Sequence, residues 1–323
     1  MASLLLKGRL ALELPKINQA LAHACKELPL SVQPVAEHIF AAGGKRLRPF
    51  LTLLTARLLG YTQEDIYTLA ISLEMLHAAT LLHDDIIDQA PLRRGQPAAH
   101  TCFPLNTTIL AGDALLAAGN ALVATFNDPQ LSLCFSKATT MTCAGEITEI
   151  AHQHDPDLSE ASYLEIIRGK TAFLISCACT MGAIVAKAPE EQVKACTSFG
   201  ENIGLAFHLV DDALDFAPES VTGKPSGGDL REGKLTPPLR YYQQSLSTQA
   251  RQEFDAAFRT GTFSPQECQD IAHAIHAQGF MQTTRDCANT YLSQALEALL
   301  PLPQRPEKDL LKAMAEYVRD RTK

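Results

Sequence analysis

Two acidic motifs, far apart in the chain, have the composition and spacing of a metal site. The first lies in LLHDDIID (81–88) and the second in LVDDALD (209–215). In each motif two adjacent aspartates are followed, after two apolar residues, by a third, so that the first and the third share one helix face. The six carboxylates are Asp84, Asp85 and Asp88, and Asp211, Asp212 and Asp215.

Both motifs stand at the C-terminal end of an apolar stretch that is expected to be helical. Carboxylates there oppose the helix macrodipole, and like charges four residues apart destabilise the helix. A bound divalent cation would remove both penalties, and hard carboxylate oxygens suit Mg²⁺. One such motif is also compatible with a solvated helix end, but two of them predict a paired magnesium site. If the two helices pack side by side, the motifs face each other above a shaft with apolar walls.

Basic residues beside these motifs indicate that the magnesium site serves a diphosphate, because protein-bound Mg²⁺ commonly contacts substrate phosphates. A glycine-rich basic turn, GGKRLRP (43–49), opens a predicted helix, and helix N-termini with Lys and Arg favour anions. Two arginines follow the first motif, and GKT (169–171) lies in a helix that Gly169 is expected to kink. The candidate cations are Lys45, Arg48, Arg93, Arg94, Lys170, Lys224 and Lys234.

The elements that position these residues are predicted to be helices, since apolar residues recur at helical spacing along most of the chain. Thr62 and Asp65 resemble a capping box for the helix that carries the first motif. The two long connections, 90–106 and 218–236, are predicted to be loops. We therefore expect a single all-α domain over 1–323, with helices at 4–26, 32–42, 49–59, 63–88, 107–127, 130–151, 160–187, 190–217, 237–246, 265–278, 281–300 and 307–321.

Composition excludes several classes of function. Lys plus Arg is 28 and Asp plus Glu is 36, so the net charge is 28 − 36 = −8, with no basic block to bind nucleic acid or an anionic membrane. The nine cysteines contain no CxxC, which favours a reducing cytoplasm over a disulfide framework. The longest stretch without a charged residue or a histidine, 171–186, is shorter than the roughly 20 residues that a membrane span needs. We expect a cytoplasmic protein with no membrane span.

The motifs together resemble the trans-prenyltransferases, the head-to-tail isoprenyl diphosphate synthases. The resemblance rests on GGKRLRP, on LEMLHAATLLHDDIIDQAPLRRGQP, on GKT, and on GLAFHLVDDALDF followed by TGKPSGGDLREGKLTPPL. It covers nearly the whole chain. It implies an all-α bundle around a central cavity, the isoprenoid synthase fold, and commonly a homodimer. It also implies three Mg²⁺ ions that bridge both acidic motifs and an allylic diphosphate.

The resemblance assigns roles to individual residues. The allylic diphosphate is held by Arg93, Lys170, Lys224 and Lys234, and Thr171 lies near the developing carbocation. Isopentenyl diphosphate is held by Lys45, Arg48, His77 and Arg94. Two positions depart from the family pattern, because His208 and Glu149 stand where glutamine is usual. A free histidine titrates near pH 6.5, so His208 is expected to cause a loss of rate in acid.

The resemblance also bears on product length. Thr80 and Ala79 lie four and five residues before Asp84, about one helical turn below the metals, and Leu76 and Met75 lie on the next turn. In the family, bulky aromatic residues at the positions of Thr80 and Ala79 give short products. Both residues are small here, which predicts a long-chain, octaprenyl-type all-trans product. The competing interpretation is that Ala79 only lets two helices approach closely.

The implied reaction needs no nucleophilic side chain. The allylic diphosphate ionises, the double bond of isopentenyl diphosphate captures the cation, and the adduct loses a proton. Three alternatives remain: a farnesyl or geranylgeranyl diphosphate synthase, a terpene cyclase, and a non-catalytic subunit of a prenyl synthase. A cyclase is expected to be rich in aromatic residues, which make up 6% here with no Trp. A non-catalytic subunit is expected to lack metal-binding aspartates.

Overall fold

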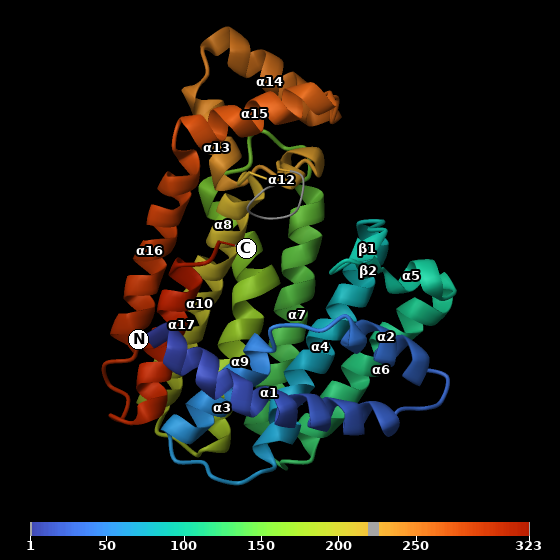
Figure 1. Cartoon of the computed structure of the whole chain (residues 1–323), viewed down its shortest axis with the longest axis vertical. Helices are drawn as coiled ribbons and strands as arrows, with labels where there is room; N and C mark the ends of the chain where they lie inside the picture. The colour runs from blue at the N-terminus through green and yellow to red at the C-terminus, as the bar shows by residue number, and fades with distance from the viewer. Residues whose placement is uncertain (1, 219–225, 323) are drawn as a thin grey trace. The chain divides into compact units, whose positions relative to one another are not determined.

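The computed structural model describes residues 2–218 and 226–322, and their secondary structure is almost entirely helical (Figure 1). The predicted all-α class is therefore confirmed. Through residue 151 the elements are α1 (Ala2–Lys26), α2 (Gln33–Ala41), α3 (Leu47–Leu58), α4 (Ile66–Ile87), β1 (Leu92–Arg93), β2 (Gln96–Pro97), α5 (Ala99–Cys102), α6 (Leu105–Ala124) and α7 (Pro129–Ala151). The remaining elements are α8 (Glu160–Ile167), the π-helical turn η1 (Arg168–Ala172), α9 (Phe173–Val185), α10 (Glu190–Asp215), α12 (Gly228–Arg231), α13 (Pro237–Ser245), α14 (Thr248–Thr260), α15 (Pro265–Ala277), α16 (Phe280–Ala298) and α17 (Pro306–Arg319).

Several local predictions need correction. Segment 90–106 is not all loop: it contains an antiparallel pairing of β1 with β2 and the short helix α5. The capping box at Thr62 is wrong, because Asp65 is the N-cap residue of α4 and makes no capping hydrogen bond with its side chain. Helix α14 was not predicted, since its sequence is largely polar, yet it is capped by Ser247 and buries Phe254 and Phe258.

Contacts divide the chain into two compact units. The first unit comprises 1–139, 177–197 and 301–311, and the second comprises 140–176, 198–300 and 312–323. The expectation of a single domain over 1–323 stays a prediction. The first acidic motif belongs to the first unit and the second motif to the second unit, so each is described with its own surroundings.

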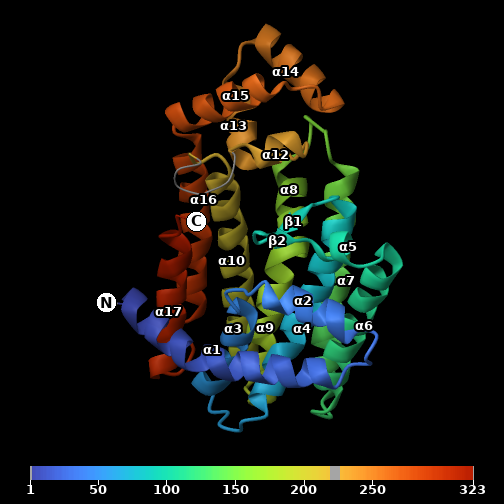
Figure 2. The same cartoon turned by 45° about the vertical axis from the view of Figure 1, so that its right-hand side comes forward.

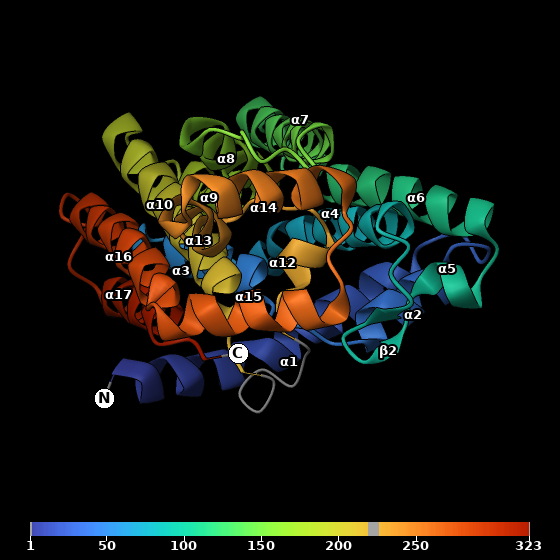
Figure 3. The ribbon, with the colours of Figure 1, turned by 90° about the horizontal axis from the view of Figure 1, so that it is seen from above.

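The first unit is organised around α4. Apolar residues that recur along this helix, such as Leu69, Leu73 and Leu76, are fully buried. Helix α6 packs against α4 (Figure 3), and a Cβ atom added to Gly119 would lie 2.8 Å from the carbonyl oxygen of Ser72. A glycine is therefore required for this close approach. The strands β1 and β2 follow α4 in the chain, in the hairpin drawn in Figure 2.

Among the residues that the structure describes, two helices, α4 and α6, are long and apolar enough to cross a membrane by length and composition alone. The apolar window of α4 is 72% buried inside the protein, as expected for a core helix. That of α6 is only 33% buried, and it exposes Leu105, Ile109 and Leu110. The apolar face of α6 is thus incompletely covered within one chain.

In the second unit, glycines bring three helical segments into backbone contact. A Cβ atom on Gly145 of α7 would lie 2.5 Å from the backbone nitrogen of Lys170 in η1. A Cβ atom on Gly204 of α10 would lie 2.5 Å from the Cα atom of Ala172, also in η1. The kink expected at Gly169 is present as this π-helical turn. It places the GKT segment directly against α7 and α10.

Candidate active site

Basic side chains of the first unit surround His77. Burial lowers the pKa of His77 well below its ordinary value, and so do the positive charges around it, which belong to Arg48, Arg94, Arg93 and Arg46. Arg94 has a left-handed backbone, and its guanidinium donates a hydrogen bond to the carbonyl oxygen of Gly43. The basic turn and the arginine that follows the first motif therefore meet, as the sequence predicted. We call Arg48, His77, Arg93 and Arg94 the arginine cluster.

Arg46 holds the basic turn in place, a role that the sequence reasoning missed. It is 6% exposed, its backbone is left-handed (φ 47°), and it precedes α3 as the N-cap residue. Its guanidinium lies 2.7 Å from Glu74 of α4 and also donates to Asn18. The flanking residues differ: Lys45 is exposed, and Arg48 is half-buried with its Nε atom buried and without a hydrogen-bond partner among the described residues. Burial, assisted by Arg94, lowers the pKa of Arg48 to about 10.

The aspartates of the first motif differ in exposure. Asp84 is half-buried, Asp88 is exposed, and Asp85 is 1% exposed. Arg93 of β1 donates from Nε to Oδ1 of Asp85 at 2.8 Å. The second oxygen, Oδ2, is buried and has no hydrogen-bond partner within the described part of the chain. Arg93 thus engages the motif itself, whereas the resemblance assigned it to the allylic diphosphate.

The second motif has different partners. Asp211 lies 2.7 Å from Arg321. The hydroxyl of Tyr163 donates to Oδ2 of Asp212, whose pKa is raised well above its ordinary value by burial and by Asp211 and Asp215. Oδ2 of Asp215 accepts from the backbone N–H of Asp229 at 2.9 Å, at the start of α12.

Asp229 adds a seventh carboxylate that the sequence reasoning missed. Burial, with Asp215 and Asp212 nearby, raises its pKa well above its ordinary value. Its Oδ2 atom is buried and accepts no hydrogen bond from the described residues. The spacing of aspartates within one helix could not identify Asp229, because this residue lies beyond the end of α10, in the short helix α12. Asp229 therefore adds a buried carboxylate close to Asp212 and Asp215.

Two candidate lysines of the second unit, Lys170 and Lys234, are already paired with glutamates. Lys170 lies 2.6 Å from Glu149 and 2.8 Å from Glu146, both on α7. Lys234 lies 3.1 Å from Glu149 and 2.7 Å from Glu232. Although burial opposes it, the two lysines lower the pKa of Glu149 to about 2. The departure from glutamine at this position therefore creates an ion pair between Glu149 and two lysines.

The side chains of His208 and Thr171 are in contact. The hydroxyl oxygen of Thr171 lies 2.7 Å from Nδ1 of His208, and Nε2 lies 3.5 Å from Asp212. Burial, assisted by Lys170 and Lys234, lowers the pKa of His208 to about 4. The pKa of His208 therefore lies below that of a free histidine, and the expected loss of rate in acid stays a prediction. The imidazole is neutral at physiological pH.

A cavity of about 170 Å³ joins these groups in the second unit. Its walls combine the ion-paired lysines and the buried acids with apolar side chains. The cavity lining includes Glu149, Tyr163, Lys170, His208, Asp212 and Lys234. The cavity therefore brings the buried aspartate of the second motif together with the two ion-paired lysines and His208.

The donor set fits a hard divalent cation. The candidate ligands are all carboxylate oxygens, and two of them, on Asp85 and Asp229, are buried without hydrogen bonds from the described residues. Within residues 2–218 and 226–322, no three potential ligands converge closely enough to enclose an ion by themselves.

The remaining candidates are located as follows. Met75, Leu76 and Ala79 of α4 are buried, and Thr80 is half-buried and donates to the carbonyl oxygen of His77. Lys224 lies outside the described residues.

Comparison with known proteins identifies the family. Residues 30–275 match the Polyprenyl synthetase family. A heptaprenyl diphosphate synthase component 2 from Geobacillus stearothermophilus is 35% identical over 94% of this chain and 96% of its own. The relatives of this chain also include geranylgeranyl diphosphate synthases.

Two solved structures share the fold over nearly their whole length. A decaprenyl diphosphate synthase from Rhodobacter capsulatus has a TM-score of 0.91 at 33% identity and covers 98% of this chain and 99% of its own. A polyprenyl synthase from Caulobacter crescentus CB15, complexed with calcium and isoprenyl diphosphate, has a TM-score of 0.93 at 32% identity, covering 99% and 98%. The chain therefore belongs to the polyprenyl synthetase family, and it is a prenyltransferase of the head-to-tail type with the isoprenoid synthase fold.

Proposed function

We propose that this enzyme uses Mg²⁺ to condense isopentenyl diphosphate with an allylic diphosphate, and that repeated cycles give a long-chain all-trans polyprenyl diphosphate. The observation that carries the substrate assignment is the arginine cluster around a neutral His77. Several guanidinium groups at one place, with a buried Nε that lacks a partner among the described residues, offer the planar donors that phosphate oxygens require.

The chain's own residues bind, orient and shield the reactants in this proposal. Arg48 and Arg94 would bind a diphosphate, with His77 as a neutral hydrogen-bonding group beside them. Lys170 and Lys234, which are held in position by ion pairs with glutamates, would bind the leaving diphosphate. Thr171 and His208 would present neutral oxygen and nitrogen atoms to the developing cation, and the apolar walls would keep water away. Mg²⁺, when bound to the aspartates, supplies charge neutralisation on the diphosphate.

The long-chain product is supported by α4. Ala79 and Thr80, about one helical turn before Asp84, carry small side chains, so no aromatic ring closes that position. A heptaprenyl and a decaprenyl synthase among the similar proteins point the same way. Geranylgeranyl diphosphate synthases among the relatives keep a shorter product as the alternative.

We further propose a homodimer in the cytoplasm. Helix α6 leaves large apolar side chains exposed, with Leu110 at 64%, and Leu133 on α7 is 70% exposed. A second copy would cover such a face, since obligate interfaces are strongly apolar. The name "component 2" of the heptaprenyl relative makes a different partner subunit the competing assembly. All nine cysteines are free thiols, which fits a reducing compartment.

Incubation of the purified protein with Mg²⁺, isopentenyl diphosphate and a farnesyl primer tests the proposal. A ladder ending in a long polyprenyl diphosphate is the expected product. Arrest at geranylgeranyl diphosphate would contradict the long-chain assignment, and a hydrocarbon product would indicate a cyclase. No product from this chain alone, with product after a second subunit is added, would replace the homodimer by a heteromer.

A further inference from the structure

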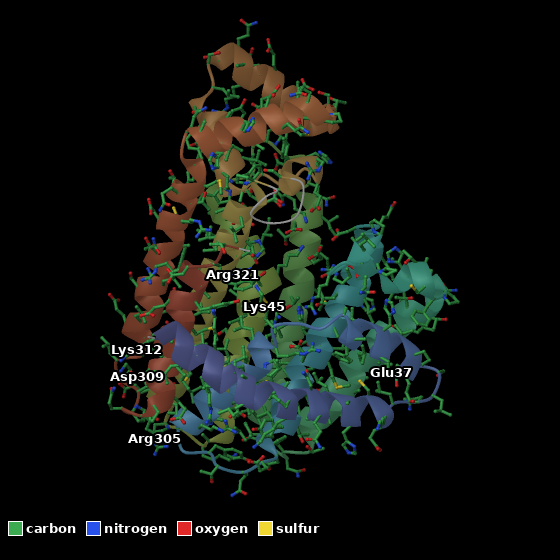
Figure 4. All side chains as sticks on the ribbon, in the orientation of Figure 1. Glu37, Lys45, Arg305, Asp309, Lys312 and Arg321 are labelled. Carbon is green, nitrogen blue, oxygen red and sulfur yellow. The ribbon has the colours of Figure 1, made fainter. Side chains whose placement is uncertain are left out.

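The C-terminal segment brings a buried arginine to the second acidic motif. Arg321, two residues beyond α17 and labelled in Figure 4, lies with a guanidinium nitrogen 2.7 Å from Oδ1 of Asp211. Its side chain is 7% exposed, whereas that of Asp211 is 45% exposed. The arginine therefore reaches an exposed carboxylate from the protein side.

Two further contacts fix this position. The guanidinium lies 4.1 Å from the ring centroid of Phe207, which precedes Asp211 by about one turn of α10. Arg285 of α16 donates to the backbone carbonyl oxygens of Arg319 at 3.2 Å and of Arg321 at 2.8 Å. The chain end is thus fastened by its backbone, and the side chain is aimed at the motif.

The hydrogen bonding of Arg321 is incomplete. Its Nε and Nη1 atoms are buried and have no hydrogen-bond partner among the residues that the structure describes. A guanidinium has five N–H donors, and buried donors are normally satisfied. A second cation, Arg285, lies nearby, and its pKa is lowered by burial and by the positive charge of Arg321. An arginine that served only for packing is not expected to lie beside a second arginine while its own buried N–H donors lack partners. The role of Arg321 is therefore expected to depend on its positive charge.

We propose that Arg321 is the resident counter-ion of the second acidic motif, which a divalent cation must displace from Asp211, so that metal loading releases the C-terminal segment. This inference rests on the proposed metal site. Asp212 and Asp215 repel Asp211 when no metal is bound, and Arg321 offsets that repulsion. A cation at Asp211 would face the guanidinium as a like charge, so the two compete for one carboxylate.

The first test measures metal affinity without substrate. Mn²⁺ binding to the full chain is followed from the electron paramagnetic resonance signal of free Mn²⁺. Arg321→Met keeps the apolar length over Phe207 but removes the competing charge, and we expect it to bind Mn²⁺ about tenfold more tightly. Arg319→Met is the matched control, because it removes the same charge from the same segment at an exposed position. Equal affinity in the two variants, or weaker binding by Arg321→Met, would overturn the proposal.

The second test follows the segment itself by hydrogen–deuterium exchange. Asp211→Asn should increase exchange over 317–322 without metal, and saturating Mn²⁺ should do the same in the wild type. Unchanged exchange in both cases would overturn the proposal even if Arg321→Met did not fold. Failure of the proposed function is distinguishable, since the wild type would then form no polyprenyl diphosphate while the exchange response was retained.

Discussion

The two DDxxD motifs have the same spacing but opposite surroundings. The first is followed by the arginine cluster, and its buried member, Asp85, pairs with a guanidinium. The second is surrounded by further acids, and its buried member, Asp212, meets the neutral hydroxyl of Tyr163. The positive charges near the second motif are already engaged, because Lys170 and Lys234 pair with glutamates. A shared motif therefore does not mean a shared electrostatic role.

The difference suggests a division of labour. The first unit gathers several guanidinium groups around a neutral His77 and is suited to bind an anion. The second unit concentrates carboxylates and is suited to bind cations. In both motifs the first aspartate, Asp84 or Asp211, is the more accessible of the adjacent pair, and the second is buried. The accessible aspartates are thus the better candidates for direct metal contact.

The largest effect is expected from removing an accessible aspartate. Asp84→Ala or Asp211→Ala should lower kcat by about a thousandfold or more, because metal-borne charge stabilisation is worth several kcal/mol. Folding should survive, since a carboxylate at a helix C-terminus is unfavourable there. Steady-state kinetics with titrated Mg²⁺ provide the measurement, and Asp113→Ala, at an exposed position on α6, is the control. Near-normal turnover in the double variant would refute the paired site.

Substrate affinity should depend more on the charge of the arginine cluster than on the charges of Lys170 and Lys234. Arg48→Met should raise the KM for isopentenyl diphosphate about 10- to 100-fold, as expected for the loss of charged hydrogen bonds. Lys170→Met should cost less substrate affinity, since Glu146 and Glu149 already neutralise that lysine. Lys137→Met, exposed on α7, controls for net charge. Equal effects at Arg48 and Lys170 would remove the proposed contrast between the units.

The helix before the first motif should control product length. Ala79→Tyr adds a ring about one turn below Asp84, and chromatography of the products should show truncation to a few isoprene units while the first condensation continues. Leu92→Tyr, at a position that is 60% exposed, should leave the product unchanged. An unaltered long product from Ala79→Tyr would favour the packing interpretation of this residue.

The glycine contacts of the second unit should matter for stability. Gly204→Ala places a methyl group 2.5 Å from the Cα atom of Ala172, a backbone atom that cannot move aside alone. Overpacking of this kind costs about 1–3 kcal/mol. Urea denaturation measures the loss, with Gly8→Ala as the control because no atom lies within 4 Å of the added carbon there. Wild-type stability in Gly204→Ala would mean that η1 and α10 separate easily.

The smallest effect concerns the buried histidine of the second unit. Since the pKa of His208 is about 4 in the folded protein and near 6.5 when unfolded, the unfolded chain binds the extra proton between these values. The stability that the neutral imidazole contributes is therefore lost as pH falls from about 6.5 towards 4. Metal-free His208→Gln should lose less stability than the wild type between pH 7 and pH 5, as measured by Tm. Parallel losses would place the histidine in a solvated environment.

Much of this protein is determined by local sequence. Helical periodicity predicts α4, α7 and α10 to within a few residues, because burial of one face needs only a repeat near 3.6. The same repeat predicts that the aspartates of the two motifs lie at the C-terminal ends of α4 and α10. The contact between the basic turn and Arg94 was implied only by the family resemblance, which assigned Lys45, Arg48 and Arg94 to one diphosphate.

The tertiary structure alone decides which charges are engaged. Lys170 meets Glu149 because Gly145 and Gly169 let α7 and η1 touch, and Arg321 meets Asp211 because Arg285 holds the chain end. These partners come from separate segments, and no local pattern encodes their distance. The pKa of His208 depends on burial and on the lysines around it for the same reason. Spacing along a helix is a local property, whereas the electrostatic environment of a side chain is a sum over everything that packs around it.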